Sequence, residues 1–307
     1  MKDIEIILVN DFSTDDTLSY IEYLQKEDPR IKIIKNQKNM GILYSRSIGA
    51  LSAKGKYIFS LDNGDMFLDY DVFDTIYNIS IKDNFDIVEF KVIKSNALYN
   101  LPGNSLLDTK YSEHELNLVL FQPKLGYYPL QPKFERGEFS INDNYLWNKC
   151  IKTDIYQKSL NLFGEERYKR HMTYYEDLII VIILFNVAKS FKFIGKYAIL
   201  NVRNIIMIYE RPKTIMNLYD MYLIDALIDF SKDIKENKKI IVQYMFNLMG
   251  KKYLNETLNN NDNRNLFNSL LNRIYSCKYI SDEDKMEIKN ITSKYANISF
   301  REKTNKF

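Results

Sequence analysis

A turn that carries two carboxylates, Asp62 and Asp65, is the part of this chain best suited to chemistry. It follows a short apolar run at residues 57–60 (YIFS), which predicts a buried strand. Carboxylates at the C-terminal end of a strand in an α/β sheet stand where ligands bind. One or two carboxylates commonly hold a divalent cation on the phosphates of a substrate. Asp, Asn and Gly are also the commonest residues of surface turns, so the turn alone leaves both interpretations open.

A second carboxylate pair, Glu176 and Asp177, opens a run that is apolar nearly all round, residues 174–188. Such a run predicts a buried helix. A carboxylate on a buried helix can have its pKa raised toward the value that suits a general base. Without other motifs, the same pair is an ordinary helix start. Trp147, the only tryptophan, could stack on a sugar ring, although a lone Trp is more often a core residue.

Strands and helices alternate in the first third of the chain, which predicts a parallel sheet covered by helices. The run at residues 4–9 (IEIILV) is typical of a strand buried on both faces. A helix is expected to begin at Ser13 or Thr14, with Asp15 and Asp16 in its first turn. Further strands are expected at residues 31–34, 57–60 and 87–90, and further helices at residues 42–51 and 70–81.

The rest of the chain is expected to form two regions, an α/β domain that ends at residue 208 and a helical region over 209–307. The proline-rich stretch 123–138 is irregular and could be a functional loop. Residues 191–202 are expected to form paired short strands. Apolar residues at helical spacing predict four helices in the C-terminal region, at residues 215–230, 240–249, 266–275 and 282–295.

The composition narrows the class of protein. Hydrophobic residues make up 46% of the chain, charged residues 27%, and the formal net charge is only +3, which argues against a nucleic-acid partner. Cys150 and Cys277 lie too far apart for a zinc motif or a disulfide framework. The N-terminus lacks a signal-peptide pattern. The longest apolar run is shorter than the ~20 residues of a membrane span, so a cytoplasmic protein is expected.

Five blocks of this sequence together resemble the family 2 glycosyltransferases, which have the GT-A fold. They lie at residues 4–17 (IEIILVNDFSTDDT), 39–50 (NMGILYSRSIGA), 54–67 (KGKYIFSLDNGDMF), 146–149 (LWNK) and 176–177 (ED). Their order and approximate spacing are those of the family. The resemblance implies an α/β fold with a mainly parallel sheet flanked by helices, here with a C-terminal helical extension.

The same resemblance implies how the donor substrate is bound. The donor would be a nucleotide-diphosphate sugar, with UDP as the expected nucleotide, and Mn²⁺ or Mg²⁺ would bind its diphosphate. Asp11 falls where the family contacts the base, commonly uracil. Arg46 falls where the family contacts the nucleotide. Asp62 and Asp65 belong to the turn that binds the metal, and Asp62 is also expected to contact the nucleotide sugar.

The resemblance also implies the reaction. Asp177 falls on the position of the catalytic base, with Glu176 beside it. The base would take the proton of an acceptor hydroxyl as that oxygen attacks the anomeric carbon with inversion, through an oxocarbenium-like transition state. The acceptor would be a saccharide or a lipid-linked molecule. The metal would neutralise charge on the departing nucleoside diphosphate.

Two departures from the family pattern favour an alternative function. Gly64 stands where the family has a metal-binding Asp, so Asp65 would have to take over that role. The family also carries a strand and a helix before the segment that begins at Ile4, so the chain is expected to be truncated at its N-terminus relative to the family. The alternative is a catalytically degenerate member that binds a saccharide or a protein.

A lysine-rich segment raises a hypothesis about location. Four lysines, at positions 232, 235, 238 and 239, could dock the helical region on the cytosolic face of a membrane, where a lipid-linked acceptor lies. The alternative is a solvated helix face, because no strong apolar face with bulky anchors accompanies these lysines.

Overall fold

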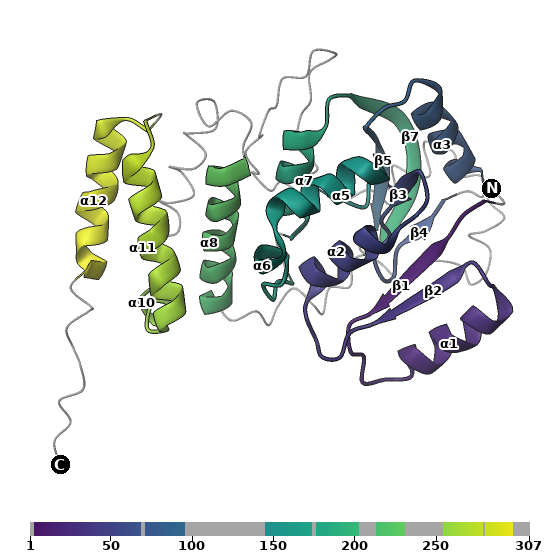
Figure 1. Cartoon of the computed structure of the whole chain (residues 1–307), viewed down its shortest axis with the longest axis horizontal. Coiled ribbons are helices and arrows are strands. Elements are labelled where there is room, and N and C mark those ends of the chain that lie inside the picture. The colour runs from purple at the N-terminus through teal and green to yellow at the C-terminus, as the bar shows by residue number, and fades with distance from the viewer. Residues whose placement is uncertain are drawn as a thin grey trace. The chain divides into compact units, whose positions relative to one another are not determined.

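A computed structural model describes residues 3–68, 71–95, 145–173, 176–202, 213–230, 254–278 and 280–296 (Figure 1). The chain divides into two compact units, Met1–Tyr209 and Glu210–Phe307. Some expectations lie outside the described residues: the loop at 123–138, the helix at 240–249 and the four lysines between 232 and 239.

The first unit opens with a two-stranded parallel sheet. Strand β1 (Ile6–Asn10) leads through helix α1 (Thr17–Glu27) to strand β2 (Ile31–Lys35), and Ile6 pairs with Ile31. The apolar residues of β1 are only half-buried, so the expectation of a strand buried on both faces is wrong. In the part of the chain that the structure describes, β1 pairs only with β2.

Helix α1 begins later than expected. Its N-cap is Asp16, and the first helical residue is Thr17, whose N–H donates to the Asp15 carboxylate. The N–H of Ser13 donates to the side chain of Asn10 instead of entering a helix. Side chains of Asn and Asp that bond to nearby backbone compete with helix formation in this way. Residues 13–16 therefore form a turn, and the two aspartates precede the helix.

A second sheet has the strand order β3-β6-β5-β7-β4. Its strands are β3 (Tyr57–Phe59), β4 (Met66–Phe67), β5 (Ile87–Ser95), β6 (Lys149–Lys152) and β7 (Phe191–Val202). Strand β6 runs antiparallel to both β3 and β5, and β4 runs antiparallel to β7, whereas β5 and β7 are parallel. The expected mainly parallel sheet is therefore a mixed one. Residues 191–202, expected as paired short strands, form one continuous strand.

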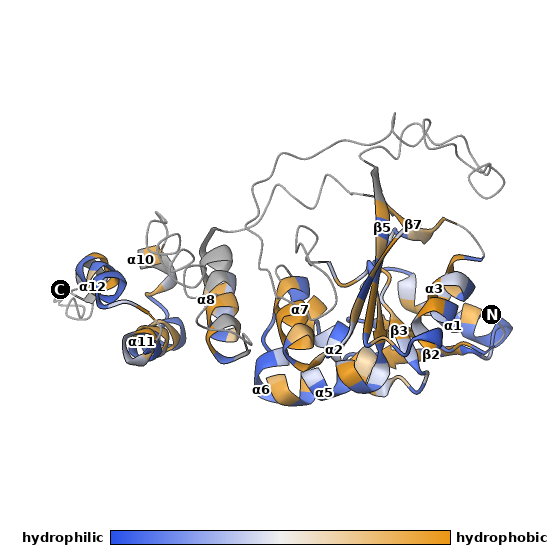
Figure 2. Ribbon diagram, turned by 90° about the horizontal axis from the view of Figure 1, so that it is seen from above, coloured by the Kyte–Doolittle hydropathy of each residue, from blue (hydrophilic) through white to orange (hydrophobic). Residues whose placement is uncertain are grey.

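Five helices complete the described part of this unit after β2: α2 (Ile42–Ser52), α3 (Val72–Lys82), α5 (Thr153–Phe163), α6 (Glu165–Tyr168) and α7 (Glu176–Val187). Every residue from Leu178 to Phe185 in α7 is buried, so the prediction of a helix buried on all sides is confirmed. In Figure 2 this helix is coloured mostly orange. Because α7 is buried, the carboxylate pair Glu176 and Asp177 at its start lies next to the protein interior.

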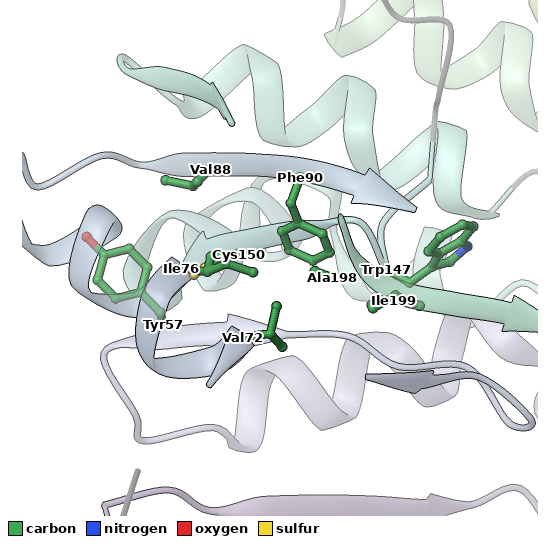
Figure 3. Packing of buried hydrophobic residues seen from close by; sticks show 9 residues of the cluster. All are labelled: Tyr57, Val72, Ile76, Val88, Phe90, Trp147, Cys150, Ala198 and Ile199. Carbon is green, nitrogen blue, oxygen red and sulfur yellow. The ribbon is translucent and has the colours of Figure 1, made fainter. Parts of the chain in front are cut away.

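A hydrophobic cluster joins α3 to the second sheet and to the segment before β6 (Figure 3). Phe59 packs edge-on against Phe73, with ring centroids 4.9 Å apart. Both rings are partly buried, and their packing holds the end of β3, from which the turn at residues 62–65 projects. The members are Tyr57, Val72, Ile76, Val88, Phe90, Trp147, Cys150, Ala198 and Ile199.

The second unit is helical where the structure describes it, with α8 (Lys213–Phe230), α10 (Leu254–Thr257), α11 (Asn261–Ser276) and α12 (Asp282–Ala296). The Asn260 side chain caps α11 by accepting two backbone N–H bonds. Arg273 pairs with two aspartates of α8 and so ties α11 to that helix. None of the helices in the described ranges is long and apolar enough to cross a membrane.

Candidate active site

The structure brings Asp62 and the second carboxylate pair, Glu176 and Asp177, to one arginine. Arg46 lies on α2, and its Nη2 is 2.6 Å from Asp62 Oδ1 in the turn after β3. The same nitrogen lies 3.6 Å from Glu176 Oε1 and 3.4 Å from Asp177 Oδ1 at the start of α7. Residues more than 100 positions apart in the sequence thus share one guanidinium group.

A glycine fixes the beginning of α2 close to the segment before α7. Gly41 has a φ of 87°, a left-handed value that favours glycine. A Cβ atom on Gly41 would lie 2.7 Å from the carbonyl oxygen of Met172. This close approach lets the N–H of Ile42 donate to that oxygen at 2.8 Å. This bond ties the start of α2 to Met172, four residues before α7. It thereby fixes the helix that carries Arg46 close to the start of α7.

Asp11 holds the loop between β2 and α2. Its Oδ1 accepts from the N–H of Met40 at 2.7 Å and from the amide of Asn36 at 2.7 Å, and its Oδ2 accepts from the N–H of Gly41 at 2.8 Å. The family resemblance implies that Asp11 contacts the base of a nucleotide, and this loop contact was not predicted. A carboxylate oxygen can accept two hydrogen bonds, and Asp11 Oδ2 accepts one from Gly41, so it can accept one more.

The Asp62–Asp65 segment is a tight turn, closed by a bond from the Asp65 N–H to the Asp62 carbonyl at 3.1 Å. Gly64 has a φ of 90°, and a Cβ atom there would meet nothing within 4 Å. Backbone conformation, not crowding, is therefore the structural reason for a glycine at this position.

The described residues contain no group of three or more His, Cys, Asp or Glu side chains that could hold a metal ion. A magnesium or manganese ion shared with a diphosphate needs only one or two carboxylates, because phosphate oxygens and water supply the other ligands. Asp65 and Asp62 fit this smaller requirement, although Asp62 shares its carboxylate with Arg46. Two carboxylates are enough for a metal ion that is already bound to the diphosphate of a substrate. They are too few to bind a metal ion by themselves.

Burial raises the pKa of Asp177 to about 7, with the negative charges of Glu176 and Asp62 adding to the rise and Arg46 opposing it. Burial also acts on Arg46 and disfavours its charge, but the attraction of Asp177, Asp62 and Glu176 is stronger and the pKa of Arg46 is raised. Asp177 Oδ1 is buried and has no hydrogen-bond partner, although it pairs with Arg46. The group is therefore an acid that loses its proton near neutral pH, as a general base requires.

Replacing Arg46 by methionine is expected to raise the pKa of Asp177 further above about 7, because the nearest positive charge is lost while Glu176 and Asp62 remain. A carbon-13 NMR titration of the aspartate carboxyl groups would measure the shift. Arg30→Met is the matched control, since Arg30 pairs with Asp28 on the surface. An unchanged titration of Asp177 in the Arg46 variant would contradict this assignment.

The segment 145–149 contributes core residues and not a sugar-stacking face. Trp147 is 3% exposed, and its ring stacks on Tyr145 with centroids 4.7 Å apart. In Figure 3 it lies beside Ile199 of the hydrophobic cluster. This placement corrects the sugar-stacking hypothesis in favour of the core alternative, as expected for a large apolar ring that can be buried.

Two further buried polar residues near the site were missed by sequence reasoning. Lys149 is fully buried, pairs with Glu89 at 2.9 Å and lowers the pKa of Asp177. Tyr156 on α5 is 1% exposed, and burial raises the pKa of its phenol, with Asp177 and Glu176 adding to the rise. The sequence signal for Lys149 was the block 146–149 (LWNK), in which the lysine ends a short segment that contains the tryptophan.

Comparisons with known proteins point to glycosyltransferases. The family model described as Glycosyl transferase family 2 matches residues 1–127. A cholesterol galactosyltransferase of Borreliella burgdorferi is 26% identical over 301 residues, which is 94% of this chain and 76% of that protein. The GalNAc(5)-diNAcBac-PP-undecaprenol beta-1,3-glucosyltransferase of Campylobacter jejuni is 41% identical over 179 residues, which is 56% of this chain and 54% of that protein.

The fold matches a solved structure as well. S. aureus TarS 1–349 in complex with UDP superposes with a TM-score of 0.57 at 12% identity, and the match covers 96% of this chain and 79% of that one. At this identity the likeness establishes the fold alone. The family match over residues 1–127, the named relatives and this fold together support a family 2 glycosyltransferase with the GT-A fold.

Proposed function

We propose that this glycosyltransferase moves a sugar from a UDP-linked donor, with inversion, to a hydroxyl group of a saccharide or lipid-linked acceptor. The observation that carries the proposal is the group at Arg46, where one guanidinium contacts Asp62, Glu176 and Asp177. The Arg46 guanidinium, a positive charge that could contact a nucleotide diphosphate, lies 3.4 Å from the Asp177 carboxylate, whose pKa is about 7, and this supports the proposal.

In the proposed reaction, Asp177 takes the proton from the acceptor hydroxyl. The acceptor oxygen forms a bond to the anomeric carbon, and the bond from that carbon to the diphosphate oxygen breaks. The nucleoside diphosphate leaves with the electron pair, and the configuration at the carbon inverts. Arg46 contributes positive charge close to both sites of charge development, and its pairing with Asp62 holds it beside the carboxylates.

Asp65 and Asp62 are the residues proposed to hold Mn²⁺ or Mg²⁺. When bound there, the cation would supply positive charge to the diphosphate as it departs. Gly64 contributes no side-chain ligand, so the affinity of the turn for the metal would depend on Asp65 more than in a turn with a third carboxylate.

The named relatives support the choice of substrates. UDP is bound to the TarS protein whose fold matches this chain. The acceptor named for the Campylobacter jejuni relative is linked to undecaprenol, and that named for the Borreliella burgdorferi relative is cholesterol. Both acceptors are lipids, which supports a lipid-linked acceptor here and transfer at the cytosolic surface of a membrane.

Titration of the purified chain with UDP, with and without Mn²⁺, tests the proposal by calorimetry. Binding that requires Mn²⁺ and is lost in Asp65→Ala is the expected result, because Asp65 is the ligand that the metal depends on. Asp83→Ala is the control, since Asp83 is an exposed aspartate at the end of α3. Absence of UDP binding under every condition would contradict the proposal.

The absence of a side-chain ligand at Gly64 favours a second candidate, a degenerate family member that binds a saccharide or a protein without catalysis. The two candidates differ in turnover. Release of UDP from UDP-galactose or UDP-glucose in the presence of Mn²⁺ supports the enzyme. Binding of UDP without any release supports the binding module.

A further inference from the structure

Tyr156 is a buried tyrosine close to the candidate site, and its hydroxyl group has no protein partner. The residue lies on α5, and its surface is only 1% exposed. Its hydroxyl oxygen is enclosed, and no atom of the described residues forms a hydrogen bond with it. Because an unpaired buried hydroxyl costs stability, such groups are nearly always bonded to protein or to ordered water. The hydroxyl of Tyr156 therefore needs a partner that the neighbouring side chains do not supply directly.

Two more atoms of the site share this property. Arg46 Nε and Asp177 Oδ1 are enclosed, and neither has a hydrogen-bond partner in the ranges that the structure describes. The 3.4 Å contact between Arg46 Nη2 and Asp177 Oδ1 is an ion pair that lacks hydrogen-bond geometry. Attraction between charges sets no direction, so the ion pair alone does not fix how the carboxylate of Asp177 is turned.

The three atoms belong to helices that pack together. Helix α5 packs against α2, which carries Arg46, and against α7, which carries Asp177. The charges of Arg46, Asp177 and Glu176 all act on the phenol of α5. Burial raises the pKa of this phenol, Asp177 and Glu176 add to the rise, and Arg46 opposes it. The phenol is therefore a neutral group that can donate and accept hydrogen bonds beside the charged residues.

One ordered water molecule can satisfy all three atoms, since a buried water typically forms about three hydrogen bonds. It would accept from the Nε–H of Arg46 and from the hydroxyl of Tyr156, and it would donate to Asp177 Oδ1. We propose that Tyr156 is a positioning residue for Asp177, whose carboxylate it orients through a buried water that is also bonded to Arg46 Nε. The inference rests on the proposed role of Asp177 as the base and adds the group that orients it.

Tyr156→Phe removes only the hydroxyl and keeps the aromatic ring. The rate of UDP release from UDP-galactose or UDP-glucose is expected to fall by up to about 100-fold, because a misplaced catalytic group reacts slowly. Affinity for UDP with Mn²⁺ should stay the same, because the pair of Arg46 and Asp62 remains. Tyr57→Phe is the matched control and should keep the wild-type rate, since this hydroxyl donates to the backbone carbonyls of Ser80 and Phe85.

A double-mutant cycle distinguishes positioning from a general structural effect. If Tyr156 acts through Asp177, Tyr156→Phe should change the rate little in an Asp177→Asn background. An equal fold-loss in both backgrounds would overturn the proposal. A wild-type rate in Tyr156→Phe would also overturn it, and a raised midpoint of thermal unfolding would then show that the hydroxyl is unpaired.

A crystal structure of the wild type tests the water directly. One water within hydrogen-bond distance of Arg46 Nε, Asp177 Oδ1 and the hydroxyl of Tyr156 is the expected result, and its absence would overturn the proposal. Failure of the proposed function has a different signature. In that case the wild type would release no UDP from either donor, or Asp177→Asn would keep the wild-type rate, whatever the crystal structure shows at Tyr156.

Discussion

Asp177→Asn is expected to lower the rate of UDP release from UDP-galactose or UDP-glucose by about 10²–10⁴-fold, the usual contribution of a general base. Asparagine keeps the shape of the side chain but cannot accept a proton from the attacking hydroxyl or water. Affinity for UDP should change little, because Arg46 and Asp62 remain. Steady-state rates and calorimetry on the same preparations measure both quantities.

The pH dependence gives this prediction a second measurement. Asp177 has a pKa of about 7 in the folded protein, whereas an Asp in an unfolded chain has about 3.9. The catalytic rate should therefore rise with pH through about 7. Stability moves the other way: the folded state holds the proton more tightly, so the free energy of unfolding falls as pH rises from about 4 to 7.

Asp177→Asn removes this penalty, so the variant is expected to melt at a higher temperature than the wild type at pH 8. The difference should shrink toward pH 5, where Asp177 is protonated in the wild type. Glu176→Gln is the matched comparison, because Glu176 raises the pKa of Asp177 and its loss should shift the rate profile to lower pH. A full loss of rate in Glu176→Gln with normal rate in Asp177→Asn would assign the base to Glu176.

The parts of the fold that could be predicted depend on local pattern. The buried helix α7 follows from a run without polar interruption, and the strand before Asp62 follows from a short apolar run that ends in turn residues. Strand β6 was not predicted, because Lys149 and Lys152 flank only two apolar residues. Its antiparallel pairing with β3 and β5 is a long-range contact that no local pattern encodes.

The residues of the candidate site could be predicted from local pattern, but the contacts between them could not. Asp62, Asp65 and Asp177 lie next to strong local signals, a turn and a helix start, and the sequence identified them. The meeting of Asp62 and Asp177 at Arg46 depends on how α2 and α7 pack, and no local sequence pattern encodes that packing.

The largest expected effect on stability comes from Lys149. The side chain is fully buried, and its ammonium donates to the Tyr145 carbonyl and the Asn148 side chain at 2.7 Å each, while it pairs with Glu89. Lys149→Met leaves the buried Glu89 carboxylate without this charge, which is expected to lower the free energy of unfolding by about 3–5 kcal/mol. Urea denaturation at pH 8 measures the loss.

The double variant Lys149→Met, Glu89→Met is expected to recover most of this loss, because two apolar side chains of similar volume replace a buried pair at little net cost. Lys152→Met is the matched control, since Lys152 is partly exposed and lies 3.8 Å from Asp86, whose carboxylate keeps the backbone N–H bonds of Lys189 and Ser190 when the lysine is lost. If the double variant were as unstable as Lys149→Met, the backbone and amide contacts of the ammonium, not its charge pairing, would hold the segment. Because the charge of Lys149 also lowers the pKa of Asp177, the single and double variants should both raise that pKa, which links the stability of this buried pair to the chemistry of the site.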